Sequence, residues 1–417
     1  MNKTRIQQLL DHILNTPPSM WIMLGFSIGY IVFFIRPILF SAPVMQFFKY
    51  VPAADPIGID LKQMLSYSQS WFVDKQTPYI GRNLYPPLAS VLFTPLLFVK
   101  FSWAYKIVTL INVFCFVMIT LVFPILICRE KQVSSLTMLV FITGLFSYGF
   151  QFELERGQFN VIAVFICFLS IWIYYYHNKY RYLAYILFII SVQLKVFPLI
   201  FIVMLIDDWQ DKRNNIKRLL ILASLNFVLF FVLGPHVFVD FMKAIIAQTV
   251  NPDIGPGNHS IRSFVTLQSY KPGWIWIIHF SGLAQLALLA VIADCIFLSM
   301  HQAYRQNQKN INPLLMLTCT IGALLIPSVS IDYKLSILAA PVALLFSDNK
   351  YLERANRHGL NIIFGLLLLI FSTAYCSTLF SSTNKPLMFE NNFPALITML
   401  LAVTFLSLVY NWKSKKT

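Results

Sequence analysis

Long apolar runs recur along most of this chain and are separated by short polar segments. A helix needs about 20 apolar residues to cross a hydrocarbon core of about 30 Å. The pattern therefore predicts an all-α, polytopic membrane protein. We expect membrane-spanning helices near residues 20–40, 104–128, 133–151, 158–176, 217–234, 272–299, 312–327, 334–347, 359–379 and 394–411.

One apolar segment is too short for a span. Residues 86–100 contain Pro86, Pro87 and Pro95 within an otherwise hydrophobic stretch. This length favours an interfacial or re-entrant helix over a membrane crossing. We expect it to follow the polar segment 41–85, so that both form a large first outer loop over residues 41–103.

A second apolar segment, residues 182–206, is long enough for a span but has Lys195 and Pro198 in its middle. A lysine at mid-membrane is costly, and proline removes a helix hydrogen bond. We therefore predict two half-helices, 182–194 and 197–206, which go out and back and meet at a break. Broken helices occur where they line a polar cavity. With these two half-helices, the bundle has about 12 membrane segments.

Composition agrees with a membrane protein, since 58% of the 417 residues are hydrophobic and only 12% are charged. Soluble domains average about 45–50% apolar and about 25% charged residues. The net charge of +15 does not indicate nucleic-acid binding, because no basic stripe with interleaved aromatic residues is present.

The basic residues instead indicate topology. Eighteen of the 32 Lys and Arg residues lie in the N-terminus, in the segments 129–132, 177–181, 207–218, 301–310 and 348–358, and in the C-terminal tail. Cytoplasmic loops are enriched in Lys and Arg. We therefore expect a multi-pass cell-membrane protein with both termini cytoplasmic.

With this topology, most of the other polar clusters fall on the outer face. They lie at 41–85, 153–160, the Lys195 break, 235–271, 328–334 and 380–393. Outer loop 235–271 begins as an amphipathic surface helix and continues as a turn-rich segment. Since the chain shows no internal repeat and no linker, we expect one domain over residues 1–417.

The sequence predicts neither a metal site nor another cofactor. The six cysteines lie within or at the ends of apolar runs, and none forms a CxxC pair. They are typical of small buried hydrophobic residues. The histidines show no metal-ligand spacing.

Asp60 is the leading catalytic candidate. It precedes residues 61–72, which could form a surface helix with Tyr67 and Trp71 toward the membrane. Asp60 could then simply cap that helix. Alternatively, it could be a general base that takes a proton from an acceptor hydroxyl at the membrane–water interface. Asp55, which precedes a proline, is more typical of a turn.

Lys195 is the leading candidate for binding an anion. It could be a structural lysine, paired or snorkelling, or a cation for a phosphate at the helix break. Arg262, Lys271 and Lys334 could join it, although each alone is more typical of a solvated interfacial cation.

Two further clusters could contact a substrate. Glu153 and Glu155 lie close to Gln158 and Asn160, and these side chains could bind sugar hydroxyls or form an interfacial cluster offset by Arg156. Asp332 and Lys334, in an apolar neighbourhood, indicate an aqueous cavity or a mutual pair.

The order of these motifs resembles glycosyltransferase family 87. The motifs are Asp60, Thr77-Pro78-Tyr79, Tyr85-Pro86-Pro87-Leu88, Gly157-Gln158-Phe159-Asn160 and Leu194-Lys195-Val196-Phe197-Pro198. The resemblance covers residues 20–210 well and the C-terminal half only in layout. The family comprises polyprenol-phosphate-sugar-dependent enzymes of the GT-C superfamily, including mycobacterial phosphatidylinositol-mannoside mannosyltransferases.

The resemblance implies a GT-C-type bundle in which Asp60 is the base and Lys195 contacts the lipid phosphate. Gln158 and Asn160 would line the cavity, and we add Tyr79 and Tyr85 of the motifs to the candidate cavity residues. One feature departs from the family pattern: the outer turn 328–333 lacks the histidine of many members, and Asp332 could take its place.

The expected activity is inverting transfer of a hexose, with mannose as the first choice, from a polyprenyl-phosphate carrier to a glycan or glycolipid acceptor on the outer face. A lipid-linked sugar flippase or transporter is one alternative, although such proteins usually show paired repeats with matching helix breaks. An inner-membrane polysaccharide polymerase or ligase is another, although its large loop would usually lie late in the chain.

Overall fold

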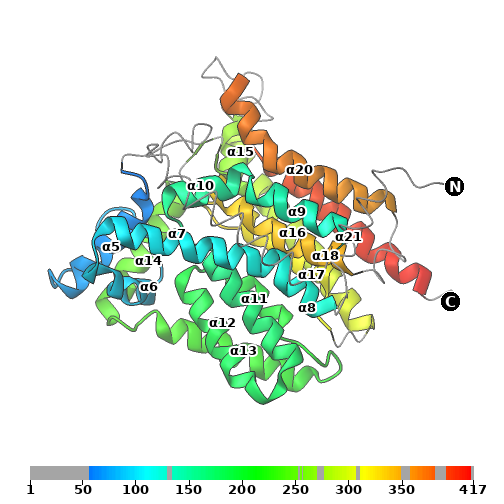
Figure 1. Cartoon of the computed structure of the whole chain (residues 1–417), viewed down its shortest axis with the longest axis horizontal. Coiled ribbons are helices and arrows are strands. Elements are labelled where there is room, and N and C mark those ends of the chain that lie inside the picture. The colour runs from blue at the N-terminus through cyan, green and yellow to red at the C-terminus, as the bar shows by residue number, and fades with distance from the viewer. Residues whose placement is uncertain are drawn as a thin grey trace, which may run out of the picture.

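The computed structural model describes residues 56–128, 134–251, 254–255, 257–269, 277–306, 310–348, 357–380 and 391–414. Within these residues the chain is helical, and the extended pairing is limited to one isolated bridge between Asn258 and Ile331 (Figure 1). The predicted all-α class is therefore confirmed. The expected first span 20–40, Asp55 and Lys271 lie outside the described residues.

The α-helices are α5 (Ile59–Phe72), α6 (Pro87–Phe93), α7 (Phe101–Val117), α8 (Phe123–Cys128), α9 (Ser135–Leu145), α10 (Tyr148–Arg156), α11 (Asn160–Tyr176), α12 (Arg181–Leu194), α13 (Lys212–Leu229), α14 (Pro235–Val250), α15 (Ile261–Ser269), α16 (Ile277–Gln306), α17 (Pro313–Leu325), α18 (Ala339–Ser347), α20 (Arg357–Phe380) and α21 (Phe393–Ser414). Short 3-10 segments are η2 (Thr94–Phe98), η4 (Asn178–Tyr180), η5 (Phe197–Met204) and η6 (Asp332–Leu338), and η3 (Met118–Val122) is a π-helical turn between α7 and α8.

Two described helices are long and apolar enough to cross a membrane, Phe101–Cys128 and Phe280–Arg305. The pair α9–α10 adds a third if its two parts, bent by 43°, count as one span. Several shorter apolar helices accompany them, among them α11 and α17. These helices support a membrane protein, and the total of about 12 segments stays a prediction.

Apolar side chains cover much of the outside of the bundle. Leu220 and Val228 on α13 and Leu283 and Phe297 on α16 are each more than 60% exposed. Large exposed apolar surfaces are unusual in soluble monomers and mark an interaction with a membrane or a partner. On helices of this hydrophobicity, the surface is suited to lipid.

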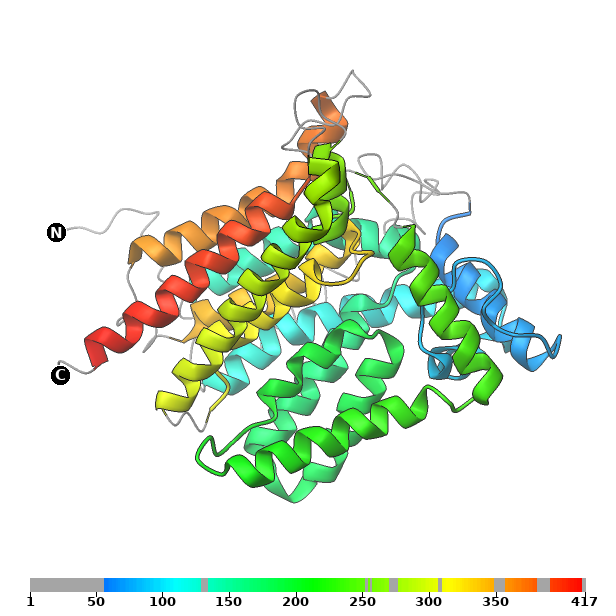
Figure 2. The ribbon, with the colours of Figure 1, turned by 180° about the vertical axis from the view of Figure 1, so that it is seen from behind.

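The core lies around α17, whose residues are all buried. Helix α17 packs against α16, α18, α21 and η5, and Figure 2 shows α16, α20 and α21 side by side on the outside of this centre. The predicted spans 312–327 and 334–347 thus correspond to helices enclosed by protein.

The predicted break at Lys195 is confirmed. Helix α12 ends at Leu194, Lys195 is extended with φ −148°, and η5 follows with Pro198 in its first turn. The second half is a 3-10 helix.

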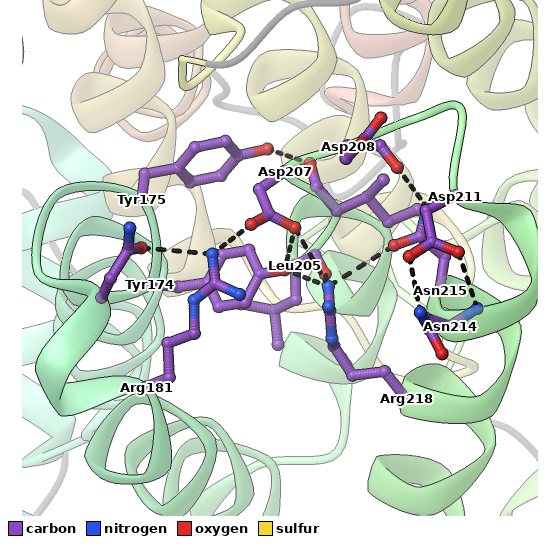
Figure 3. A network of polar contacts seen from close by, with 12 residues as sticks. Tyr174, Tyr175, Arg181, Leu205, Asp207, Asp208, Asp211, Asn214, Asn215 and Arg218 are labelled. Atoms are coloured by element: carbon purple, nitrogen blue, oxygen red, sulfur yellow. Dashed lines mark hydrogen bonds and ion pairs between the residues drawn. The ribbon is translucent and has the colours of Figure 1, made fainter.

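The polar network at the other end of α12 shows that the chain goes out and back. Arg181, before the break, forms an ion pair with Asp207, after it, and Arg218 and Tyr174 join the same carboxylate (Figure 3). In one straight helix, 26 residues would separate Arg181 from Asp207 by about 39 Å. The network therefore fastens α11, α12 and α13 together at the end of the bundle opposite the break.

Two further predictions need correction. The expected span 133–151 is broken after Leu145, because Ser147 accepts a hydrogen bond from the N–H of Phe150 and starts the new helix α10. The turn-rich part of loop 235–271 contains the helix α15, which was not predicted.

Candidate active site

A cavity of about 1320 Å³ opens at one end of the bundle, where residues of α5, α14 and α15 form part of its wall. We call this the site end. Asp60, Tyr85, Gln158, Lys195, Arg262 and Lys334 line the cavity. These residues come from five sequence regions predicted to share one face, so the structure brings those regions together. A second part of the wall is apolar and includes Ile200, Phe230, Met242, Leu289 and Ala323.

A close contact between two glycines brings α5 to the site end. Gly58 and Gly157 have φ of +78° and +65°, a left-handed conformation that glycine adopts readily. Gly157 ends α10, and the N–H of Gly58 donates to the carbonyl of Glu155 at 2.8 Å. A Cβ on Gly157 would lie 2.9 Å from the Cβ of Leu61 and 3.2 Å from the Cα of Gly58. The first turn of α5 therefore packs directly on the end of α10.

Asp60 lies in this first turn, and its carboxylate points to the cavity. The residue preceding α5 is Gly58, and no side chain caps the helix. The capping role considered for Asp60 is therefore wrong. Its Oδ2 instead accepts a hydrogen bond of 2.6 Å from Nε2 of Gln158. The side chain is half-buried, so it can be reached from the cavity.

Tyr67 also faces the cavity, not the membrane as expected. It follows Asp60 by seven residues, which places both side chains on the same face of α5. Burial, and then the charge of Asp60, raise the pKa of Tyr67. The seven-residue spacing from Asp60 could therefore have identified Tyr67 as a cavity residue from the sequence.

Lys195 is 7% exposed, and its ammonium group lies between two aromatic rings. The Nζ atom is 4.3 Å from the ring centre of Tyr85 and 4.2 Å from that of Phe159. It donates to Oε1 of Gln158 at 2.7 Å. No carboxylate within salt-bridge distance of Lys195 is found among the described residues. In the described part of the chain, neutral groups therefore hold the lysine, and no carboxylate contact neutralises it.

Arg262 and Lys334 line the cavity from α15 and η6. Lys334 donates to the carbonyl of Val329 at 2.6 Å, and Arg262 donates to the carbonyl of Val250 at 3.2 Å. Backbone carbonyls thus hold both cations. Because a carbonyl carries no net charge, these contacts do not neutralise the cations.

Glu153, Glu155 and Asn160 do not line the cavity. Both acids are fully buried. Glu153 accepts from the N–H groups of Asn160 and Val161 at 2.5 and 3.1 Å and from the amide of Asn160 at 2.7 Å. It thereby caps α11, while Glu155 pairs with Arg156 at 3.2 Å.

The two motif tyrosines have different positions. Tyr85 lines the cavity, and its hydroxyl is 3.3 Å from Nε2 of Gln158. Tyr79 lies behind it, where its hydroxyl donates to the carbonyl of Tyr85 at 2.7 Å. Asn83 braces the same loop by donating to the carbonyl of Pro78 at 2.8 Å.

Asp332 is buried behind the cavity wall and contacts a histidine that sequence reasoning did not connect with it. Its Oδ1 is 3.2 Å from Nδ1 of His259 and accepts from Asn392 at 3.1 Å. Nε2 of His259 is 3.0 Å from the hydroxyl of Ser330. Burial, despite the hydrogen bond to Asp332, lowers the pKa of His259. The cluster fastens the loop before α15 to the turn that begins η6.

The charges of the cavity are unequal. Among the described residues that line it, Asp60 is the single carboxylate, whereas five are basic: Arg82, Arg156, Lys195, Arg262 and Lys334. One acid beside an excess of cations suits a base acting near an anionic group. In the described part of the chain, no three His, Cys, Asp or Glu side chains are grouped as metal ligands.

A comparison with protein families matches residues 83–328, more than half of the chain, to glycosyltransferase family 87. Comparisons with curated proteins and with solved structures find no match. The family match includes Tyr85, Gln158, Lys195 and Arg262, four of the residues that meet in the cavity. This chain therefore belongs to glycosyltransferase family 87.

Proposed function

We propose that this glycosyltransferase moves a hexose, with mannose as the first choice, from a polyprenyl-phosphate carrier to a glycan or glycolipid acceptor on the outer face of the cell membrane. The observation that carries the proposal is the cavity itself, which joins one reachable carboxylate, a surplus of cations and an apolar wall. The cations suit the phosphate of a lipid-linked sugar, and the apolar wall suits its lipid. The carboxylate suits removal of the proton from the acceptor hydroxyl.

In the proposed reaction, Asp60 takes the proton of the acceptor hydroxyl, and the acceptor oxygen attacks the anomeric carbon. The bond between that carbon and the phosphate oxygen breaks on the opposite face, so the configuration inverts. The bonding electrons leave with the lipid phosphate, whose charge Lys195 stabilises, supported by Arg262 and Lys334. The prenyl tail lies along the apolar wall between η5, α16 and α17.

Family membership favours this activity over a flippase or transporter. The acceptor side is the part of the cavity near Asp60, where Gln63, Tyr67 and Arg82 lie along the wall. The described polar regions that line the cavity were all predicted to face outward. Their common position at the site end supports an active site on the outer face.

The test is transfer from radiolabelled polyprenyl-phosphate-mannose, and from glucose and galactose analogues, by purified protein with membrane glycolipid acceptors. Loss of a general base costs about 10²–10⁴-fold in rate, so Asp60→Asn should fall by that factor. Loss of a charge-stabilising donor costs about 10²–10³-fold, and Lys195→Met should fall accordingly.

Two exposed residues provide matched controls, since neither lines the cavity. Asp74→Asn and Lys62→Met make the same changes near the two ends of α5 and should keep wild-type transfer. Undiminished transfer by Asp60→Asn would refute its role as base. Absence of transfer by the wild type from every donor would refute the donor class.

A further inference from the structure

The side chain of Gln158 lies between the proposed base and the proposed phosphate-binding cation. Its Nε2 is 2.6 Å from Oδ2 of Asp60, and its Oε1 is 2.7 Å from Nζ of Lys195. The residue is 2% exposed. One neutral amide therefore lies between an acid and a cation and is hydrogen-bonded to both.

The orientation of this amide follows from its neighbours. An ammonium group can only donate hydrogen bonds, and an ionised carboxylate can only accept them. The carbonyl end of Gln158 must therefore face Lys195, and the NH₂ end must face Asp60. The backbone is also held, because its N–H donates to the carbonyl of Glu153 at 2.9 Å and its carbonyl accepts from Asn112 at 2.7 Å.

This spacing has a consequence for both charged groups. Direct contact between Asp60 and Lys195 would form an ion pair in which each satisfies the other. With the amide between them, the carboxylate keeps Oδ1 for an acceptor hydroxyl, and the ammonium keeps two N–H groups for a phosphate. Lys195 cannot swing away freely, since the rings of Tyr85 and Phe159 hold it.

We propose that Gln158 is a positioning residue that keeps Asp60 and Lys195 apart and aims each at its own substrate. The proposal rests on the roles proposed above for these two residues. Gln158 itself exchanges no proton and forms no bond with the sugar.

Two substitutions, one that adds a charge and one that shortens the side chain, test this role and should shift the pH dependence in opposite directions. Gln158→Glu places a second carboxylate beside Asp60. Two carboxylates so close cannot both ionise, so the pair keeps a proton and the acid limb of kcat/KM moves up by at least about one pH unit. Gln158→Ala removes the side chain between the two charges, so that Asp60 pairs directly with Lys195. An opposite charge favours the ionised acid, so the acid limb moves down while transfer falls.

Other titratable groups act on the same pair. Those near Asp60 are Tyr67, Tyr85, Lys195 and Tyr333, and those near Lys195 are Glu153 and Lys334. Burial and the charge of Asp60 raise the pKa of Tyr67 and of Tyr85, so neither ionises between pH 5 and 9. These groups are common to all variants and cancel in the comparison.

The experiment compares pH profiles of wild type, Gln158→Glu and Gln158→Ala with polyprenyl-phosphate-mannose as donor. Gln151→Glu and Gln151→Ala are the controls, because Gln151 lies on α10, the helix that ends just before Gln158, and does not line the cavity. Their profiles should match the wild type. Opposite shifts for the two Gln158 variants support the proposal, whereas equal shifts or no shift overturn it.

A second measurement needs no donor and so separates this proposal from the proposed function. A proton held by the Gln158→Glu pair raises a native-state pKa, which makes the native state relatively more stable as pH falls. The Tm of Gln158→Glu relative to wild type should therefore rise as the pH falls from about 7 to about 4.5, through the raised pKa of the pair and toward the ordinary value of a glutamate. A constant difference overturns the positioning role even if the wild type transfers no sugar from any donor tested.

Discussion

The contact between Gly58 and Gly157 sets the position of Asp60, and Gly157→Ala tests this directly. The new Cβ would lie 2.9 Å from the Cβ of Leu61, whereas carbon atoms pack at about 3.5–4.0 Å. The first turn of α5 must therefore move by about 0.6–1.1 Å. Asp60 precedes Leu61 and moves with it. Misplacement of a reacting group by about 1 Å can cost about 10²-fold in rate, so we expect transfer to fall by about 10–100-fold.

The same substitution also strains the backbone, and this effect needs its own control. Alanine in the left-handed region costs about 1–2 kcal/mol. Gly234 has φ +103° and no atom within 4 Å of an added Cβ, so Gly234→Ala strains the backbone without displacing a neighbour. Both variants should lose stability in thermal unfolding, but only Gly157→Ala should lose turnover with radiolabelled polyprenyl-phosphate-mannose. Equal turnover in the two variants would show that this glycine contact does not position the base.

Three further substitutions probe groups outside the reaction itself. Glu153→Ala leaves three buried donors without an acceptor, at about 1–3 kcal/mol each, so thermal stability should fall by at least about 3 kcal/mol; a raised KM with unchanged stability would instead indicate a sugar contact. Burial raises the pKa of Asp207, but the hydrogen bond from Tyr174 and the charges of Arg181 and Arg218 outweigh this and lower it below 3.8. The stability difference between wild type and Asp207→Asn should therefore be constant above about pH 5 and shrink as pH falls below 3.8, and a difference that grows in acid would contradict this sign. His259→Ala should lower the Tm and raise the donor KM, because the loop before α15 loses its contact with the turn that begins η6; an unchanged KM would separate this cluster from the donor site.

Local features of the sequence predicted much of the fold. The break at Lys195 followed from a charge and a proline within an apolar run, and both act on their own helix wherever it packs. The out-and-back path was predicted for the two half-helices beside this break, and the ion pair between Arg181 and Asp207 shows that the chain returns to the end where α12 begins. The bend between α9 and α10 was missed, because a serine cap inside an apolar run is a weak signal.

The candidate site was predictable as a set of regions but not residue by residue. Asp60 and Glu153 are both acids beside polar motifs, yet only Asp60 reaches the cavity. Glu153 turns inward because the free N–H groups of α11 need an acceptor. Whether a carboxylate lines the cavity or caps a helix depends on which neighbours surround it in the folded chain.

The sequence by itself determined the membrane class, the helix break and the order of motifs that marks the family, because each depends on residues close together in the chain. Only the tertiary structure decided which groups meet. Asp60 and Gln158 are 98 residues apart, and His259 and Asp332 are 73 apart. The first contact requires α5 to approach the end of α10 in the space that Gly58 and Gly157 leave open. The second requires the loop before α15 to pair with the turn that begins η6. Such approaches follow from packing across the whole bundle, which no local pattern encodes.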